Sequence, residues 1–242
     1  GIYSKNGIKI RKYWTLRDQE HKESFNETVE HVKFLVEDAI TRQLISDVPI
    51  GTFLSGGLDS SIISSIANNS MIKNGIKLKT FSVTYENNDK YFKSSKFQPN
   101  SDTEYIKKMV DYLDCEHFLI TLDNQSLANA LTDAVDARDL PGMADVDSSL
   151  LLFCKEIKKE CSVALSGECA DEIFGGYPWY RDKKIRAING FPWSQSIQYR
   201  KSFIKDDVKL QNHEEYILSR YKNTIINTSK IDGISPLESR MK

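Results

Sequence analysis

The chain has 242 residues, of which 40% are hydrophobic and 28% are charged, and its formal net charge is -1. This length suits one α/β domain with a sizeable core, or one domain with extensions. The near-neutral balance argues against a nucleic-acid partner held by bulk charge, and no apolar run approaches membrane-spanning length. Four cysteines form neither a CxxC pair nor a disulfide-rich pattern, which predicts a reducing, cytoplasmic location.

The first predicted elements lead to a glycine-rich turn. Residues 1–20 are polar and irregular, and we expect a lead-in there rather than a domain. Apolar residues at helical spacing predict a helix that starts at Ser24 and stops before Pro49. A short buried strand over 50–54 follows, then the turn, then a helix that opens at Asp59 or the residue after it.

The remaining elements alternate between strands and helices. Strands are predicted over 78–85, 117–121 and 162–165, and helices over 102–114, 124–137, 148–160, 203–208 and 213–221. Residues 86–100 lack an apolar period, and we expect a mobile surface loop. The alternation predicts an α/β fold with a doubly wound parallel sheet, right-handed crossovers and flanking helices. Ligands of such sheets lie beyond the carboxyl ends of the strands.

The turn after the first strand reads Ser-Gly-Gly-Leu-Asp-Ser over residues 55–60. A strand, a glycine turn and a helix N-terminus together form an anion site, because backbone N–H groups converge there and missing Cβ atoms let a phosphate approach. The turn is not a Walker A loop, since no lysine lies in it. Asp59 would repel a polyphosphate unless a divalent cation such as Mg²⁺ lay between them. The alternative is an ordinary turn with glycine for geometry and serine for capping.

A second informative stretch covers residues 165–177. Ser166 and Gly167 end a strand, so the backbone there can approach a nucleotide. If a helix begins near residue 169, Glu168 and Asp171 lie about one turn apart, a spacing that suits metal binding or proton transfer. The alternative is an acidic first turn that only complements the helix dipole. The Gly-Gly break at 175–176 ends the helix early and favours a site.

These two stretches resemble known signatures. Residues 55–60 are similar to the pyrophosphate loop of the ATP pyrophosphatase (PP-loop) superfamily, and residues 166–177 resemble the second signature of asparagine synthetases and β-lactam synthetases. The similarity runs from about Tyr13 to Tyr180, and Cys169 stands where the family usually has a glycine. The resemblance implies an adenine nucleotide alpha hydrolase-like fold.

The resemblance also implies residue roles. ATP would be bound by Phe53, Leu54, Ser55, Gly56, Gly57, Leu58, Asp59, Ser60, Val83, Ser166 and Gly167. Asp59 and Asp171 would hold Mg²⁺, Glu168 would position or deprotonate the attacking amine, and Tyr177 would face the acidic substrate. The implied reaction is adenylation of the aspartate side chain with release of pyrophosphate, followed by amidation by ammonia.

Domain organisation follows from the same resemblance. Residues 1–20 would lead in from an N-terminal glutaminase domain, 21–180 would form the ATP pyrophosphatase core, and 181–242 would be part of a helical C-terminal region. The chain starts at Gly1 and its first cysteine is Cys115, so we expect no glutamine hydrolysis by an N-terminal cysteine and incomplete turnover. The expected partners are aspartate, ATP, ammonia from glutamine and the glutaminase domain, with no nucleic acid or membrane; a homodimer is compatible with the resemblance.

Two other functions stay open at this point. A paralogous enzyme could use the same adenylation for β-lactam closure or for amidation of another carboxylate. A nucleotide-binding domain without catalysis is the third reading, and the intact Asp59, Glu168 and Asp171 argue against it.

Overall fold

The computed structural model describes residues 1–15, 20–94, 101–205 and 212–226. The chain folds as two compact units, Gly1–Ile45 and Ser46–Lys242. Within the described ranges, none of the helices combines the length and apolar character that crossing a bilayer requires.

The first unit contains a hairpin and one long helix. Strand β1 (Ile2–Ser4) pairs antiparallel with β2 (Gly7–Lys9), and Gly7 turns the chain with a φ of +98°. The expectation of an irregular segment is therefore wrong for these residues. Helix α1 (Phe25–Gln43) begins as predicted after Ser24, whose side chain and that of Glu27 form a reciprocal capping box.

The second unit is built on a four-stranded parallel sheet with the strand order β5-β4-β3-β6. Its strands are β3 (Ile50–Phe53), β4 (Lys79–Tyr85), β5 (Glu116–Leu122) and β6 (Val163–Leu165). All four predicted strands are confirmed to within one residue at each end.

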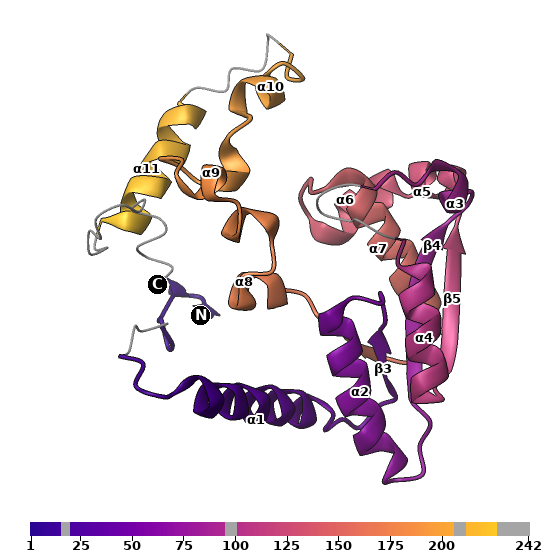
Figure 1. Ribbon diagram of the computed structural model, residues 1–242. Coiled ribbons are helices and arrows are strands. Elements are labelled where there is room, and N and C mark those ends of the chain that lie inside the picture. Colours follow the sequence, from indigo (N-terminus) through magenta and orange to yellow (C-terminus); the bar gives the residue numbers. More distant parts are fainter. Residues whose placement is uncertain (16–19, 95–100, 206–211, 227–242) are drawn as a thin grey trace. The chain divides into compact units, whose positions relative to one another are not determined.

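Helices follow each strand of this unit (Figure 1). They are α2 (Leu58–Ile72), α3 (Asn88–Tyr91), α4 (Thr103–Leu113), α5 (Asn124–Asn129), α6 (Leu131–Arg138), α7 (Ala144–Ile157), α8 (Ala170–Phe174), α9 (Lys183–Arg186), α10 (Ile197–Lys201) and α11 (His213–Ile225), with single 3₁₀ turns at Pro178–Tyr180 and Pro192–Ser194.

Three helix predictions and one loop prediction needed correction. The single helix predicted over 124–137 is two helices that meet at Ala130. Helix α7 begins at Ala144 rather than Ser148, because the Asp147 carboxylate accepts a 2.7 Å hydrogen bond from the Met143 N–H and holds this turn. The predicted loop contains the short helix α3, and its residues 95–100 lie outside the described ranges. Helix α10 lies before the helix predicted over 203–208, of which residues 206–208 are not described.

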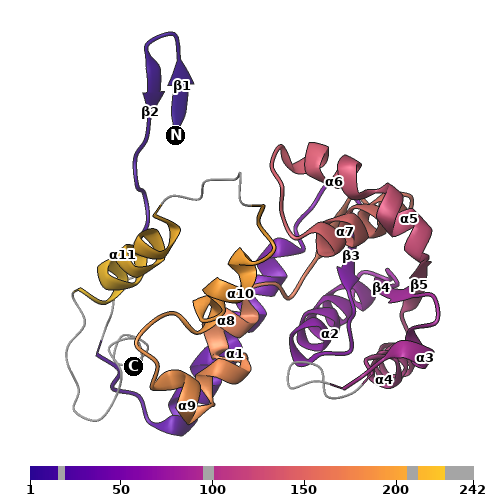
Figure 2. The same ribbon diagram turned by 90° about the horizontal axis from the view of Figure 1, so that it is seen from above.

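Helices cover both faces of the sheet because strand side chains alternate. The Thr52 hydroxyl lies 2.8 Å from that of Ser64 on α2, whereas the Phe53 ring lies 5.0 Å from that of Phe153 on α7. Figure 2 shows the strands between α7 on one side and α2 with α4 on the other. The core on the α7 side consists of Phe81, Phe153, Ile157 and Cys161, with Phe53, Val83, Phe118, Ile120 and Ala164 packed against it.

The strand order places the two sequence motifs side by side. The chain passes from β3 through β4 to β5 in one direction, then returns across the sheet so that β6 pairs with β3. The point where the order reverses lies between β3 and β6, and ligands of doubly wound sheets bind at such a point. Residues 55–60 follow β3, and residues 166–177 follow β6.

Candidate functional site

The turn after β3 has the geometry of an anion-binding loop. Gly56 has a φ of +77°, a left-handed conformation that favours glycine. A Cβ atom there would lie 2.9 Å from the backbone nitrogen of Ile106 and 3.0 Å from the carbonyl oxygen of Asp102. Gly57 caps α2 without a side-chain hydrogen bond, and the first N–H groups of a helix have no partner inside it. These N–H groups and the positive end of the helix dipole favour an anion.

Two serines hold the loop together. The Ser60 hydroxyl accepts a 3.2 Å hydrogen bond from the Ser55 N–H, lies 3.0 Å from the Ser55 hydroxyl and donates to the Gly57 carbonyl at 3.1 Å. Ser60 is buried and Ser55 is exposed. Ser60 therefore fixes the shape of the loop from inside, and Ser55 is the hydroxyl that can reach a ligand.

The strand residues predicted to contact ATP lie deeper than the loop. The Leu54 side chain is fully buried, its N–H donates to the Phe81 carbonyl at 2.8 Å, and its carbonyl accepts from the Ser82 hydroxyl. The side chains of Phe53 and Val83 pack into the core beside α7. Leu58, by contrast, is 76% exposed at the start of α2. Leu54, Phe53 and Val83 are therefore part of the packed sheet on which the loop rests.

The second motif contacts the first directly. A Cβ atom at Gly167 would lie 3.0 Å from the Asp59 Cβ and 3.4 Å from the Ser60 backbone nitrogen. The Ser166 hydroxyl accepts a 3.1 Å hydrogen bond from the Glu168 N–H, which turns the chain after β6. Because position 167 is a glycine, the two loops can come into contact, and Ser166 and Glu168 lie beside the glycine-rich loop at residues 55–60.

Asp59 and Asp171, one from each loop, lie close enough for the charge of Asp171 to act on Asp59. Burial, and then the negative charge of Asp171, raise the pKa of Asp59. The Asp171 side chain lies over Gly176, where a Cβ atom would come within 1.7 Å of Oδ1. No group of three or more protein metal ligands occurs in the described part of the chain. A cation at this position would therefore need further oxygen ligands from a substrate or from water, which is how Mg²⁺ commonly binds beside phosphates.

Tyr177 lies at the acidic side of α8. Its hydroxyl donates a 2.9 Å hydrogen bond to Glu172 Oε1. This bond, burial, and the charges of Glu172, Asp171 and Glu168 raise the pKa of Tyr177 to about 12. Tyr177 is therefore a neutral hydrogen-bond donor throughout the physiological range, and it is close enough to Glu168 and Asp171 to respond to their charges.

Cys169 departs from the glycine that the resemblance leads us to expect. It has a φ of +72°, in the left-handed region where a Cβ atom costs about 1–2 kcal/mol. The backbone thus keeps the shape that a glycine would adopt with less strain, and the motif is retained in geometry although its residue differs.

Sequence reasoning missed several residues that support the site. The Ser82 hydroxyl donates to the Leu54 carbonyl just before the loop. Asp102 and Tyr105 pack against Gly56, and the lack of a side chain at Gly176 makes space for the Asp171 carboxylate. Ser82 gave no signal in the sequence, because its strand also contains Lys79, Thr80 and Thr84. The Gly-Gly break predicts a helix end and favours a site, but the sequence did not indicate that Gly176 makes space for the Asp171 side chain.

Comparison with known proteins gives consistent matches. A family model described as asparagine synthase matches residues 31–235. Glutamine-hydrolysing asparagine synthetase 3 of Bacillus subtilis (strain 168) is 48% identical over 233 residues, which cover 96% of this chain and 38% of that protein. A putative glutamine-hydrolysing asparagine synthetase of Methanocaldococcus jannaschii is 32% identical over 179 residues, or 73% of this chain and 32% of that protein.

The chain spans well under half of the length of these curated relatives. Among solved structures, NAD+ synthetase from Burkholderia pseudomallei aligns with 91% of this chain and 92% of its own, at 11% identity and a TM-score of 0.37. That likeness is too low to carry an argument about function.

Proposed function

Because the chain belongs to the asparagine synthase family, we propose that it is the synthetase part of an ATP-dependent carbon–nitrogen ligase. The reaction is adenylation of the aspartate side-chain carboxylate with release of pyrophosphate, followed by amidation with ammonia to give asparagine and AMP. The observation that carries the proposal is the contact between Gly167 and Asp59, which joins the two signature loops at the point where the strand order reverses.

The chain's own residues would act in the first half-reaction as follows. The N–H groups at the start of α2 and the Ser55 hydroxyl bind the β- and γ-phosphates, and Ser166 with Gly167 lies along the adenylate. Donors aimed at the departing pyrophosphate stabilise charge that develops in the transition state. Ser60 and Leu54 keep this loop in shape from beneath.

The residues present fit a divalent cation, because they are two carboxylates and the negative charge of Asp171 disfavours ionisation of Asp59. Asp59 and Asp171 would hold Mg²⁺, and the bound ion supplies charge neutralisation at the phosphates. In the second half-reaction, Glu168 orients the attacking amine and takes up its proton, and Tyr177 lies on the side of the acidic substrate.

The rest of the proposal concerns the complete gene product. We propose that its nitrogen comes from glutamine, through a glutaminase domain outside these 242 residues, that it acts in the cytoplasm and that it forms a homodimer. The greater length of the glutamine-hydrolysing relatives supports the presence of a further domain. Residues 21–180 would form the nucleotide-binding core within that chain.

The test is a product assay. The complete gene product is incubated with ATP, Mg²⁺, aspartate and ammonium, and asparagine, AMP and pyrophosphate are quantified. We expect the three products in equal amounts. Formation of ADP and phosphate, or an amide only when another carboxylic acid replaces aspartate, would overturn the proposal; the second result would indicate a paralogous amidating or cyclising enzyme.

A further inference from the structure

Helix α8, which contains Asp171 and Glu172, is too short to be stable by itself. It has five residues, well below the length at which an isolated helix is stable in water. The residues at both of its ends, Cys169 and Gly175, have left-handed backbones. The direction of its carboxylates must therefore be set by contacts with the residues around it.

One restraint comes from the backbone beyond the helix. The Gly176 N–H donates a 3.0 Å hydrogen bond to the Asp171 carbonyl, and the Arg181 guanidinium donates to the Gly176 carbonyl at 3.2 Å. The Asp171 carboxylate also lies against Gly176. These contacts fix the turn that connects α8 to Tyr177.

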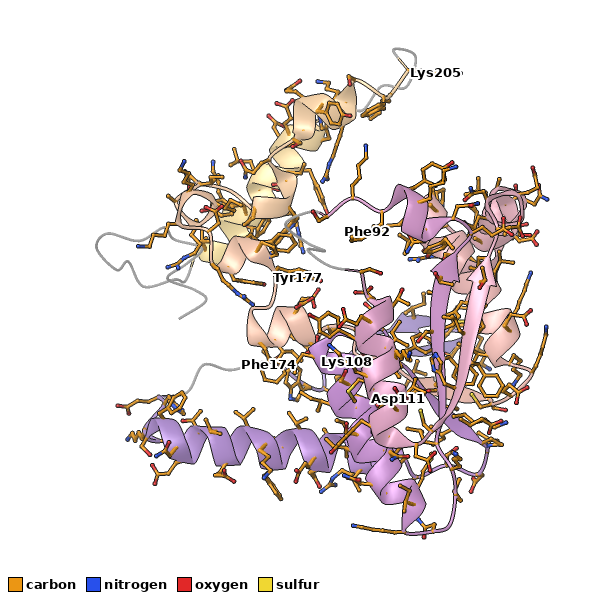
Figure 3. The ribbon with its side chains drawn as sticks, turned by 45° about the vertical axis from the view of Figure 1, so that its right-hand side comes forward. Phe92, Lys108, Asp111, Phe174, Tyr177 and Lys205 are labelled. Carbon is orange, nitrogen blue, oxygen red and sulfur yellow. The ribbon has the colours of Figure 1, made fainter. Side chains whose placement is uncertain are left out.

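Tyr177 supplies the second restraint and is held at both ends. Its hydroxyl binds Glu172, while its ring stacks on Trp179 with 4.3 Å between ring centroids and 25° between planes. Figure 3 marks Phe174 at the end of α8 and Tyr177 just beyond it. Stacking on Trp179 restricts the tilt of the Tyr177 ring, and this restricts the direction in which its hydroxyl donates to Glu172.

Trp179 is in turn anchored in a series of aromatic contacts. Its ring centroid lies 6.2 Å from that of Trp193, Trp193 stacks on Phe191 at 4.9 Å, and Phe191 meets the edge of Tyr221 at 5.4 Å. Tyr221 on α11 is buried, and its hydroxyl bonds to Asn189 at 3.1 Å. Aromatic pairs contribute about 0.5–1.5 kcal/mol each beyond the area they bury.

We propose that Trp179 and Tyr177 are positioning residues that act through Glu172 to orient α8 for attack of the nitrogen nucleophile. Neither ring needs to touch substrate, so this role differs from the substrate contact predicted for Tyr177. The inference rests on the proposed function. The glycine-rich loop at residues 55–60 follows β3 and leads into α2, and the contacts described for the aromatic series do not include either element. Asp171, the proposed Mg²⁺ ligand on α8, is held separately through Gly176. Binding of ATP should therefore depend less on the aromatic series than amide formation does.

The test uses the complete gene product with Trp179→Leu, Trp179→Phe and, as a matched control, Tyr199→Leu. Tyr199 belongs to a separate aromatic pair, with its ring centroid 4.9 Å from that of Phe203. Amide formation from ammonia and aspartate-dependent pyrophosphate–ATP exchange are measured in parallel. Since misplacement by about 1 Å can cost about 10²-fold, Trp179→Leu should lower kcat for amide formation at least about tenfold. KM for ATP in the exchange should stay within about twofold, and Trp179→Phe should restore kcat to within about threefold.

Three results would overturn the inference: amide formation by Trp179→Leu within about twofold of wild type, equal losses in Trp179→Leu and Tyr199→Leu, or exchange that falls as far as amide formation. Amide hydrogen exchange over residues 168–177 separates this inference from the proposed function. Trp179→Leu should accelerate it at least about tenfold while Tyr199→Leu should not, because local opening follows loss of packing. Unchanged amide protection in Trp179→Leu would contradict the positioning role. A wild-type protein without aspartate-dependent pyrophosphate–ATP exchange would contradict the proposed function alone.

Discussion

Asp59 occupies an unfavourable position in the free protein. It lies at the start of α2, where a helix dipole favours a carboxylate, yet burial and the charge of Asp171 raise its pKa. A folded-state pKa above the unfolded value means that the ionised carboxyl destabilises the fold at neutral pH, and that this penalty disappears as the pH falls below the unfolded value. Carboxyl groups whose pKa is shifted by burial and by a second carboxylate are typical of functional sites.

Asp59→Asn should therefore separate stability from activity. Without divalent cation at pH 7, we expect its melting temperature to equal or exceed that of wild type. Pyrophosphate–ATP exchange should fall by about 10²-fold or more, because a metal ligand at the phosphates is lost. Asp111→Asn, an exposed change on α4, serves as the control for both measurements. Exchange near the wild-type rate in Asp59→Asn would show that the assigned role is wrong.

Gly56 and Gly75 provide a matched pair for the loop geometry. Both have left-handed backbones, with φ of +77° and +70°, but a Cβ atom at Gly56 would meet backbone atoms of α4 whereas Gly75 faces open space. Each alanine variant carries the backbone strain of about 1–2 kcal/mol. Only Gly56→Ala must also displace the loop from α4, so its KM for ATP should rise at least about tenfold while Gly75→Ala changes KM less than twofold. Steady-state kinetics on both variants decides this, and equal KM values would contradict the packing argument.

At the scale of elements, sequence patterns predicted the strands well and the helix ends poorly. The strands around Phe81 and Leu165 have strong apolar patterns that fix their positions. The break at Ala130 and the start of α7 at Ala144 depend on local hydrogen bonds, such as the one from the Met143 N–H to Asp147 four residues later, which the spacing of apolar residues does not show. In the site, the residue types and their spacing were predictable. The burial of Leu54 was predicted with its strand, but that of Ser60 was not, because it depends on how the loop folds back on itself.

The pairing of β4 with β5 contains a titratable group outside the site. The His117 ring lies 2.9 Å from the Thr80 hydroxyl, and burial lowers the pKa of His117. His117 is therefore protonated more readily in the unfolded chain than in the folded one. Its contribution to the free energy of unfolding rises with pH between the lowered pKa and about 6.5 and is constant above that pH.

His117→Gln should remove this part of the pH dependence. We expect urea unfolding of the wild-type protein to show a free energy that falls between pH 6.5 and the lowered pKa, and a flatter profile in the variant over the same window. A variant with the same slope as wild type would show that His117 is not the group responsible.

At the scale of the whole molecule, the site exists because two loops more than a hundred residues apart in sequence leave neighbouring parallel strands. The adjacency of the loops after β3 and β6 follows from the strand order, which the sequence patterns did not predict. The rule for parallel sheets predicted only that ligands lie at the carboxyl ends of the strands. Membership of the asparagine synthase family limits the reactions that need to be tested, but the 242 residues span only 38% of the Bacillus subtilis relative. Experiments on turnover therefore require the complete gene product.

The most direct test of a single adenylation site is pyrophosphate–ATP isotope exchange by the complete gene product, with aspartate and a panel of other carboxylic acids and without any nitrogen donor. Exchange reports reversible formation of the acyl-adenylate and needs both loops but no amine. We expect label transfer that requires Mg²⁺ and aspartate and is at least about tenfold slower with every other acid. No exchange with any acid, despite binding of ATP, would contradict the proposed adenylation and indicate a nucleotide-binding domain without catalysis.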